Sequence, residues 1–265
     1  MKTIFSYLGY PLSESVVFPL IKSAGFDGIL LWWSDGIDPN YRSHPEIARK
    51  AGLFVENIHL PFDNSNDLWI DNLDGEEILK RHLKCIDDCA EFDIPTMVMH
   101  ASVGEALPIS EIGLRRFALL IEKAEEKQVN IALENMRRKS QLIQTAALLE
   151  QFESPRIGLC FDSGHYHARL FHEAECDLLD RFGNRIMALH LHDNKSVVTG
   201  KTEDDQHLLP FDGTIDWSGI MKKIRGKGCL GATALEVMNS GYENSPPEEF
   251  LRLAFERAER LESLK

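Results

Sequence analysis

The sequence predicts a single (β/α)₈ barrel that spans residues 1–265. Short apolar runs alternate with longer amphipathic stretches, which is the pattern of repeated βα units. No linker rich in Pro, Ser or Gly divides the chain, and one such barrel typically needs about 250 residues. An open doubly wound sheet is disfavoured because the sequence holds no GxGxxG or P-loop motif. The expected strands are 3–9, 27–33, 54–60, 95–101, 129–136, 156–162, 185–193 and 231–238.

Start and stop signals delimit the helices between these strands. Ser13 precedes the first amphipathic stretch, and Pro45 opens the second, where proline fits the first helical turn. Two connections are long, 61–75 and 194–215. Both follow the C-terminal ends of strands, the face on which such barrels carry their chemistry. The other expected helices cover 76–92, 110–127, 140–152, 172–182, 216–227 and 247–263.

The composition excludes some classes of function and indicates the cellular compartment. The chain has 42 acidic and 29 basic residues, a net charge of −13, so contact with a phosphate backbone is disfavoured. Its five cysteines form no CxxC pair, which is typical of a reducing cytoplasm, and Cys85 and Cys89 are expected to pack within a helix. The N-terminus lacks a signal-peptide pattern, and no apolar run approaches the ~20 residues of a membrane span. We therefore expect a cytoplasmic protein without a membrane segment.

Histidines and carboxylates gather at the C-terminal ends of six predicted strands. Consecutive strands of a parallel barrel point these ends at one central cavity, so the side chains can converge. A carboxylate in an otherwise apolar strand needs a partner, and a shared cation serves several strand ends at once. Mixed imidazole and carboxylate ligands suit a divalent ion such as Zn²⁺ or Mn²⁺ rather than Ca²⁺. The candidates are His59, His100, Glu134, Asp162, His165, His190 and Glu236 at strand ends, with Asp205 and His207 in the loop after strand seven.

Several further residues are candidates for contacts with a substrate. Of the adjacent Trp32 and Trp33, one is expected in the core, and we assign Trp33 to an apolar wall of the site. Arg137, Arg138 and Lys195 follow ligand-bearing strands and are placed to hold a phosphate, although solvated loop positions suit these cations equally well.

The remaining histidines receive other roles. His44, His82 and His172 fall at helix starts or within helices, where a solvated surface position is expected. His167 and His192 lie beside the candidate ligands and are expected to contact a ligand or carboxylate.

At these residues the sequence resembles the xylose-isomerase-like barrel superfamily, which includes sugar and sugar-phosphate isomerases and epimerases and the related endonuclease IV family. The resemblance covers essentially the whole chain and is most specific in LCFDSGHYHA (159–168), ALHLHDN (188–194) and DDQHLLPFDGTIDW (204–217). In the isomerase and epimerase branches, two glutamates, an aspartate and a histidine hold the metal. They match an inner set of Glu134, Asp162, His190 and Glu236. The endonuclease branch uses three zinc ions and adds an outer set of His59, His100, His165, Asp205 and His207.

Three departures bear on the choice between these branches. Phe62 and Asp63 stand where endonuclease IV carries a Tyr-Leu wedge, and an aspartate there repels a phosphate backbone. The family's glycine-rich loop after strand five is replaced by Asn135-Met-Arg-Arg-Lys. Ketose 3-epimerases have a second glutamate where this chain has Ser140, which puts that subclass in doubt. We therefore expect a small-molecule substrate and no nucleic acid.

The leading hypothesis is a metal-dependent isomerase or epimerase acting on a sugar, keto-sugar or sugar phosphate through an enediolate. Glu134 and Glu236 would exchange the carbon-bound proton as base and acid, and His165 would position a hydroxyl. Two alternatives remain open, a zinc phosphodiesterase for abasic DNA and a non-catalytic binding barrel. The oligomeric state is also open, and a homo-oligomer is compatible with the sequence. The expected substrate contacts are Trp33, His59, His100, Arg137 and Lys195.

Overall fold

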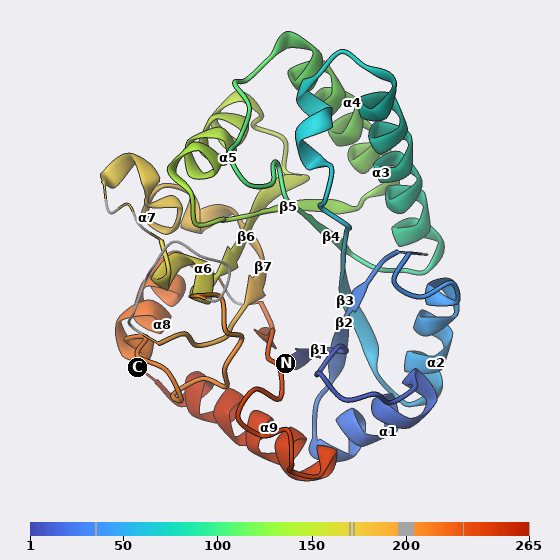
Figure 1. The fold of residues 1–265 in the computed structure, drawn as a ribbon, viewed down its shortest axis with the longest axis vertical. Helices are drawn as coiled ribbons and strands as arrows, with labels where there is room; N and C mark the ends of the chain where they lie inside the picture. The colour runs from blue at the N-terminus through green and yellow to red at the C-terminus, as the bar shows by residue number, and fades with distance from the viewer. Residues whose placement is uncertain (35, 170, 172, 196–203, 230, 265) are drawn as a thin grey trace.

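The strands form a ring. The computed structural model describes residues 1–34, 36–169, 171, 173–195, 204–229 and 231–264. Eight parallel strands lie in the order β7-β6-β5-β4-β3-β2-β1-β8, and helices surround them (Figure 1). A parallel bridge between Leu191 and Leu235 brings the chain beyond β7 against β8, so the ring nearly closes and the predicted (β/α)₈ barrel is confirmed. The strands are β1 Lys2–Phe5, β2 Gly28–Trp32, β3 Phe54–His59, β4 Thr96–Met99, β5 Asn130–Glu134, β6 Ile157–Asp162, β7 Ile186–His190 and β8 Thr233–Leu235.

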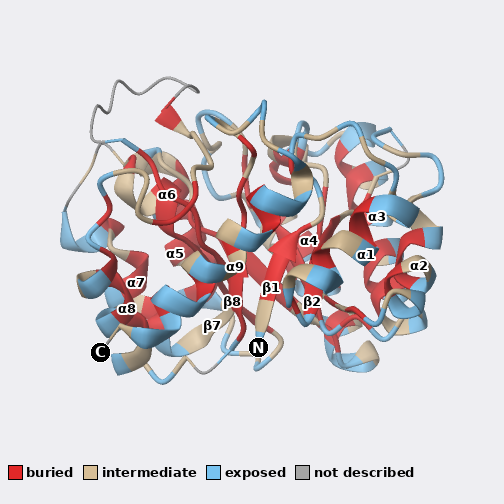
Figure 2. Cartoon of the chain, turned by 90° about the horizontal axis from the view of Figure 1, so that it is seen from below, coloured by how far each residue is buried: buried red, intermediate tan, exposed pale blue. Residues whose placement is uncertain are grey.

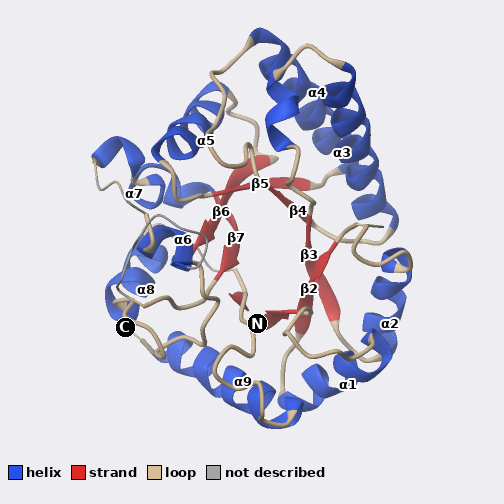
Figure 3. Cartoon of the chain, in the orientation of Figure 1, coloured by secondary structure: helices blue, strands red, loops and turns tan. Residues whose placement is uncertain are grey.

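The helices form the outer layer (Figure 3). The expected helix over 172–182 is wrong in extent, since only Leu178–Phe182 is α-helical and residue 172 lies outside the described residues. Asp177 caps this helix by accepting a hydrogen bond from the Asp180 N–H, so the helix begins only there. The helices are α1 Glu14–Ala24, α2 His44–Lys50, α3 Leu73–Glu91, α4 Glu111–Lys127, α5 Lys139–Gln151, α6 Ser163–His167, α7 Leu178–Phe182, α8 Trp217–Gly226 and α9 Pro247–Ser263.

Two apolar regions stabilise the barrel, and the burial pattern in Figure 2 shows buried strands behind helices with exposed outer faces. The larger region lies between strands and helices. The smaller one consists of Val98, Ala132, Cys160 and Ala188. Each of these stands two residues before His100, Glu134, Asp162 or His190, so it points to the same side of its strand, one layer lower. Small side chains therefore fill the barrel interior directly beneath the polar strand ends.

The long connection after β3 is anchored rather than open. The guanidinium of Arg116 on α4 is buried and donates hydrogen bonds to the carbonyls of Asp67, Leu68 and Ile70 at 3.0, 3.1 and 2.6 Å. The Asn66 side chain donates to the Val103 carbonyl at 2.9 Å, which ties this connection to the one after β4. The segment predicted as the loop 61–75 thus contains the 3₁₀ helix Ser65–Trp69 and holds two rim segments together.

Two histidines expected at the surface are buried, so that prediction is wrong for them. His82 stands four residues after Ile78 and four before Ile86, on the inward stripe of α3. His44 packs edge-on against Phe18 and lies 3.0 Å from an Asp38 carboxylate oxygen. His172 lies outside the described residues. Cys85 and Cys89 are buried in α3, as expected. Within the described ranges, no helix has the length and apolar character needed to cross a bilayer.

Candidate metal centre and substrate cavity

The inner set converges at the C-terminal end of the barrel. Glu134, Asp162 and His190 are the last residues of β5, β6 and β7, and Glu236 follows β8. Each of the four offers one ligand atom, and these atoms all lie within 4.8 Å of one another. All four side chains are buried, Asp162 and His190 completely. The barrel therefore brings together the ligands that the strand ends predicted.

The chemistry of this donor set fits a divalent ion. Three buried carboxylates surround one imidazole, and burying such a concentration of negative charge is costly without a cation. Nδ1 of His190 lies 3.0 Å from a Glu236 oxygen and 3.3 Å from a Glu134 oxygen. Neither ring nitrogen of His190 makes a hydrogen bond with the described residues. A set of carboxylate and imidazole ligands suits Zn²⁺ or Mn²⁺.

Two histidines of the outer set face the same glutamate. His59 donates from Nδ1 to the Leu60 carbonyl at 2.9 Å, which directs Nε2 at a Glu134 oxygen 3.1 Å away. Nε2 of His100 lies 3.3 Å from that oxygen, and neither His100 ring nitrogen has a hydrogen-bond partner among the described residues. An imidazole lone pair facing a carboxylate is repulsive unless a proton or a cation lies between them. His59, His100 and Glu134 therefore form a second group of metal-ligand geometry.

The rest of the outer set is linked through Asp205. His165 on α6 has Nδ1 at 3.0 Å from Glu134 and Nε2 at 3.0 Å from an Asp205 oxygen. His207 donates from Nδ1 to the Glu236 carbonyl at 3.0 Å, and its Nε2 lies 3.5 Å from Asp205. The backbone of His207 has φ of +48°, a region that a residue with a side chain seldom adopts. Such backbone strain is typical of functional sites.

The electrostatics of the site show how strongly its groups interact. Burial raises the pKa of Glu134, but the facing His100 and His190 outweigh burial and hold that pKa well below its usual range. Burial alone would lower the pKa of His207. The facing Asp205 outweighs burial and raises that pKa from 6.5 to about 9. Positive charge next to these carboxylates is therefore favourable and balances them. A divalent ion would supply the same balance.

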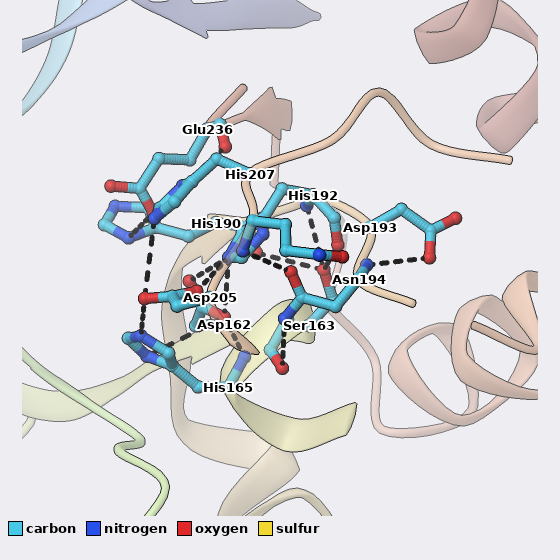
Figure 4. Close-up of polar contacts among 12 residues, drawn as sticks. Asp162, Ser163, His165, His190, His192, Asp193, Asn194, Asp205, His207 and Glu236 are labelled. Atoms are coloured by element: carbon cyan, nitrogen blue, oxygen red, sulfur yellow. Dashed lines mark hydrogen bonds and ion pairs between the residues drawn. The ribbon is translucent and has the colours of Figure 1, made fainter. Parts of the chain in front are cut away.

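The motifs at the ends of β6 and β7 interlock (Figure 4). Nε2 of His192 lies 3.1 Å from both carboxylate oxygens of Asp162. The Ser163 hydroxyl donates to the His192 carbonyl at 2.8 Å and accepts from its N–H at 3.0 Å. A Cβ at Gly164 would overlap the His192 imidazole. The contact expected for His192 is confirmed. The roles of Ser163 and Gly164 were missed, because only their three-dimensional neighbour reveals them.

A cavity of about 520 Å³ opens above the candidate metal ligands. Its volume lies within the range of small-molecule sites, roughly 300–1,000 Å³. Aromatic rings form one wall, where Trp32 lies 4.5 Å from His59 and Phe62 stacks on His100 at 4.4 Å between ring centroids. The site residues that line the cavity are His59, His100, Glu134, Arg137, Arg138, His165, Asp205, His207 and Glu236.

Two expected substrate contacts lie elsewhere. Trp33 is buried outside the cavity and donates from Nε1 to Asp88 on α3 at 2.9 Å. The prediction that Trp33 forms the cavity wall is wrong. Adjacent side chains of a strand point to opposite faces, and here Trp32 is the one that faces the cavity. Lys195 is exposed and is not among the residues that line the cavity. His167, expected beside a ligand, instead hydrogen-bonds through Nε2 to the Thr214 hydroxyl.

Comparisons with known proteins agree with this architecture. Residues 18–260 match the family model described as xylose isomerase-like TIM barrel. Protein y4fM of Sinorhizobium fredii is 33% identical over 217 residues, which cover 77% of this chain but only 64% of that protein. An inosose isomerase of Bacillus velezensis is 23% identical over 255 residues, or 92% and 90% of the two chains. The solved structure of the IolI protein with a zinc atom superposes with a TM-score of 0.79 at 19% identity, covering 98% of each chain.

Fold and site together define a (β/α)₈ barrel with a buried carboxylate and imidazole cluster beneath a cavity. The chain belongs to the xylose isomerase-like TIM barrel family, whose model covers nearly all of it. The similarity to the IolI structure at 19% identity establishes the fold and leaves the reaction to the chemistry of the site.

Proposed function

We propose that this protein is a divalent-metal-dependent isomerase or epimerase of a sugar, keto-sugar or sugar phosphate. The observation that carries the proposal is the convergence of Glu134, Asp162, His190 and Glu236, because two of these residues, Glu134 and Glu236, also line a cavity. A bound Zn²⁺ or Mn²⁺ ion would supply Lewis-acid stabilisation for negative charge that develops on neighbouring substrate oxygens. The name of one similar protein, an inosose isomerase, supports this reaction class, and the zinc atom of the IolI structure supports a divalent ion.

Glu134 and Glu236 are the groups proposed to move the proton. Both line the cavity, whereas Asp162 and His190 do not. Glu134 ends β5 and Glu236 follows β8, so the two carboxylates approach a substrate from different sides of the barrel. One can remove the proton next to a carbonyl and the other can return it, with an enediolate between the two steps. His165, also at the cavity wall, is proposed to position a substrate hydroxyl.

The cavity walls match the chemistry of such a substrate. The aromatic faces of Trp32 and Phe62 offer apolar surface to the C–H groups of a sugar. His59 and His100 stand beside these rings and offer imidazole contacts to oxygens. Arg137 stands on the connection after β5 and lines the cavity, where a guanidinium is suited to bind a phosphate group.

Proton exchange in D₂O tests the proposal directly. The metal-loaded protein is incubated with a panel of ketoses and ketose phosphates, and deuterium incorporation next to the carbonyl is measured by mass spectrometry. Glu134→Gln should lower the exchange rate about 10²- to 10⁴-fold, the usual worth of a general base. Asp88→Asn, which alters a buried carboxylate on α3, should leave it unchanged. The absence of metal-dependent exchange for every substrate would refute an isomerase, and ligand binding without turnover would favour a binding barrel.

A second candidate function, a zinc phosphodiesterase, rests on the outer set. His59, His100, His165, Asp205 and His207 all line the cavity, so more than one ion could be held. Adjacent metal ions stabilise the attacking and leaving oxygens of a phosphodiester. The net charge of −13 opposes nucleic-acid binding. Metal analysis of the purified protein and a nicking assay on an abasic duplex separate the two functions, since three zinc ions with nicking would favour this candidate.

A further inference from the structure

A buried carboxylate outside the metal centre, Asp193, organises the connection between β7 and α8. Its side chain is fully buried and accepts four hydrogen bonds from the described residues, all of them from neutral N–H groups. A carboxylate that collects several N–H donors in the interior fixes their positions, because each bond is charge-assisted. The donors are the N–H of Asn194 at 2.9 Å and of Ile215 at 3.1 Å to Oδ1, and the N–H of Phe211 at 2.9 Å and Trp217 Nε1 at 2.8 Å to Oδ2.

The returning part of the connection pairs with the residues around Asp193. The backbones of Asp193 and Leu208 exchange two hydrogen bonds of 2.8 and 3.0 Å. The side-chain oxygen of Asn194 accepts from the Gln206 N–H at 2.7 Å. These bonds flank His207 and lie next to Asp205, so the backbone that carries both outer-set residues is held from the end of β7.

The motif PFDGTIDW (210–217) has a structural explanation in these contacts. Phe211 adopts a φ of +78°, which turns its N–H toward the carboxylate. A Cβ at Gly213 would overlap Oδ1 of Asp193, so glycine is required where the carboxylate passes. Ile215 and Trp217 then supply the remaining donors. The motif and the HLHDN segment therefore form one buried hydrogen-bonded unit around Asp193.

We propose that Asp193 is the positioning residue that holds Asp205 and His207 against the metal centre. It lies outside the residues that line the cavity and acts through the connection that it organises. An asparagine at this position would turn an NH₂ group toward N–H donors, so bonds to one of its two side-chain atoms would be lost. The catalytic part of this inference rests on the proposed function, whereas the positional part does not.

A double-mutant cycle tests the catalytic part. Asp193→Asn should lower kcat about 10- to 100-fold, as expected when a group that orients an active-site residue is altered. His207→Ala should cause a similar loss, and the double variant should lose little more than either single variant because both act through one group. Asp216→Asn is the control, because Asp216 caps α8 and stands directly before Trp217. Its kcat should equal that of wild type. Losses that multiply in the double variant would overturn the proposal.

Amide hydrogen exchange tests the positional part without turnover. The Gln206 and Leu208 amides should exchange faster in Asp193→Asn than in wild type, with no change in Asp216→Asn. Gly213→Ala, which leaves Asp193 in place but crowds its Oδ1, should give the same result and serves if Asp193→Asn fails to fold. Unchanged exchange in the folded variant would overturn the proposal. Faster exchange in a protein that lacks isomerase activity would refute the proposed function while supporting the position of Asp193.

Discussion

Two groups of residues in the candidate metal centre are held in place by different means. Glu134, Asp162 and His190 are the last residues of neighbouring strands, so the barrel itself fixes their positions. Asp205 and His207 stand on a connection whose course depends on a buried hydrogen-bonded unit. A site built on strands is positioned by the whole sheet, whereas a site on a loop needs its own support. We therefore expect the residues at the strand ends to carry the chemistry of the proposed reaction, and Asp205 and His207 to adjust it.

The largest effect should come from a replacement in the inner set. Glu236→Gln removes a carboxylate that lines the cavity and should lower kcat about 10²- to 10⁴-fold, with reduced metal affinity. His207→Ala should lower kcat by only about 10- to 100-fold. Steady-state kinetics with metal titration would measure both. Equal losses for the two variants would break the distinction between the parts of the site.

A smaller effect should follow from disturbing the contact between the ends of β6 and β7. Gly164→Ala places a methyl group where the His192 imidazole lies, so that ring must leave Asp162. We expect a stability loss of about 1–3 kcal/mol, the usual result of overpacking, measured by denaturant unfolding. Metal affinity should fall about 10- to 100-fold because Asp162 loses the group that orients it.

Gly226→Ala is the matched control for this change. A Cβ at Gly226, the last residue of α8, would contact nothing within 4 Å. Alanine there should be neutral or stabilise the fold by about 0.4–1 kcal/mol through the unfolded state. If Gly164→Ala and Gly226→Ala change the free energy of unfolding by the same amount, the contact between the ends of β6 and β7 does not stabilise the fold.

The fold and the candidate ligands at the strand ends could be predicted from the sequence because both depend on short-range pattern, whereas the division into an inner and an outer set came from the family resemblance. Eight apolar runs define the strands, and a carboxylate at the end of an apolar run needs a cation wherever the strand lies. The assignment of Trp33 to the cavity wall was wrong because adjacent residues of a strand point to opposite faces, and the sequence did not show which of the two indoles faces the cavity. Trp32 pairs with His59 in the sheet, and that register determines which indole faces the cavity.

Asp193 could not be identified in the same way. Its partners Phe211, Ile215 and Trp217 lie 18 to 24 residues away, and nothing in the local pattern distinguishes it from a metal ligand. The local sequence does not distinguish a carboxylate that accepts hydrogen bonds from N–H groups from a carboxylate that binds a cation. Only the fold separates the two, because it shows which donors reach the carboxylate.

His82 extends the comparison to a histidine that lacks a carboxylate partner. The histidines of the site face carboxylates, whereas both ring nitrogens of His82 are buried without a side-chain hydrogen-bond partner among the described residues. Burial lowers the pKa of His82 from 6.5 to about 3, and the nearby Arg81 adds to the shift. The folded protein therefore keeps this imidazole neutral over a pH range in which the unfolded chain protonates it.

Because the unfolded chain binds the extra proton, the contribution of His82 to stability is present above pH 6.5 and is lost as the pH falls toward 3. Between pH 7 and 5.5 the loss should be about 1 kcal/mol, from 1.36 kcal/mol for each pKa unit. His82→Leu removes the titration, so its free energy of unfolding should fall less over this interval than that of wild type. Denaturant unfolding at both pH values measures the two slopes. Identical slopes would contradict the prediction, because they would show that folding does not shift the pKa of His82.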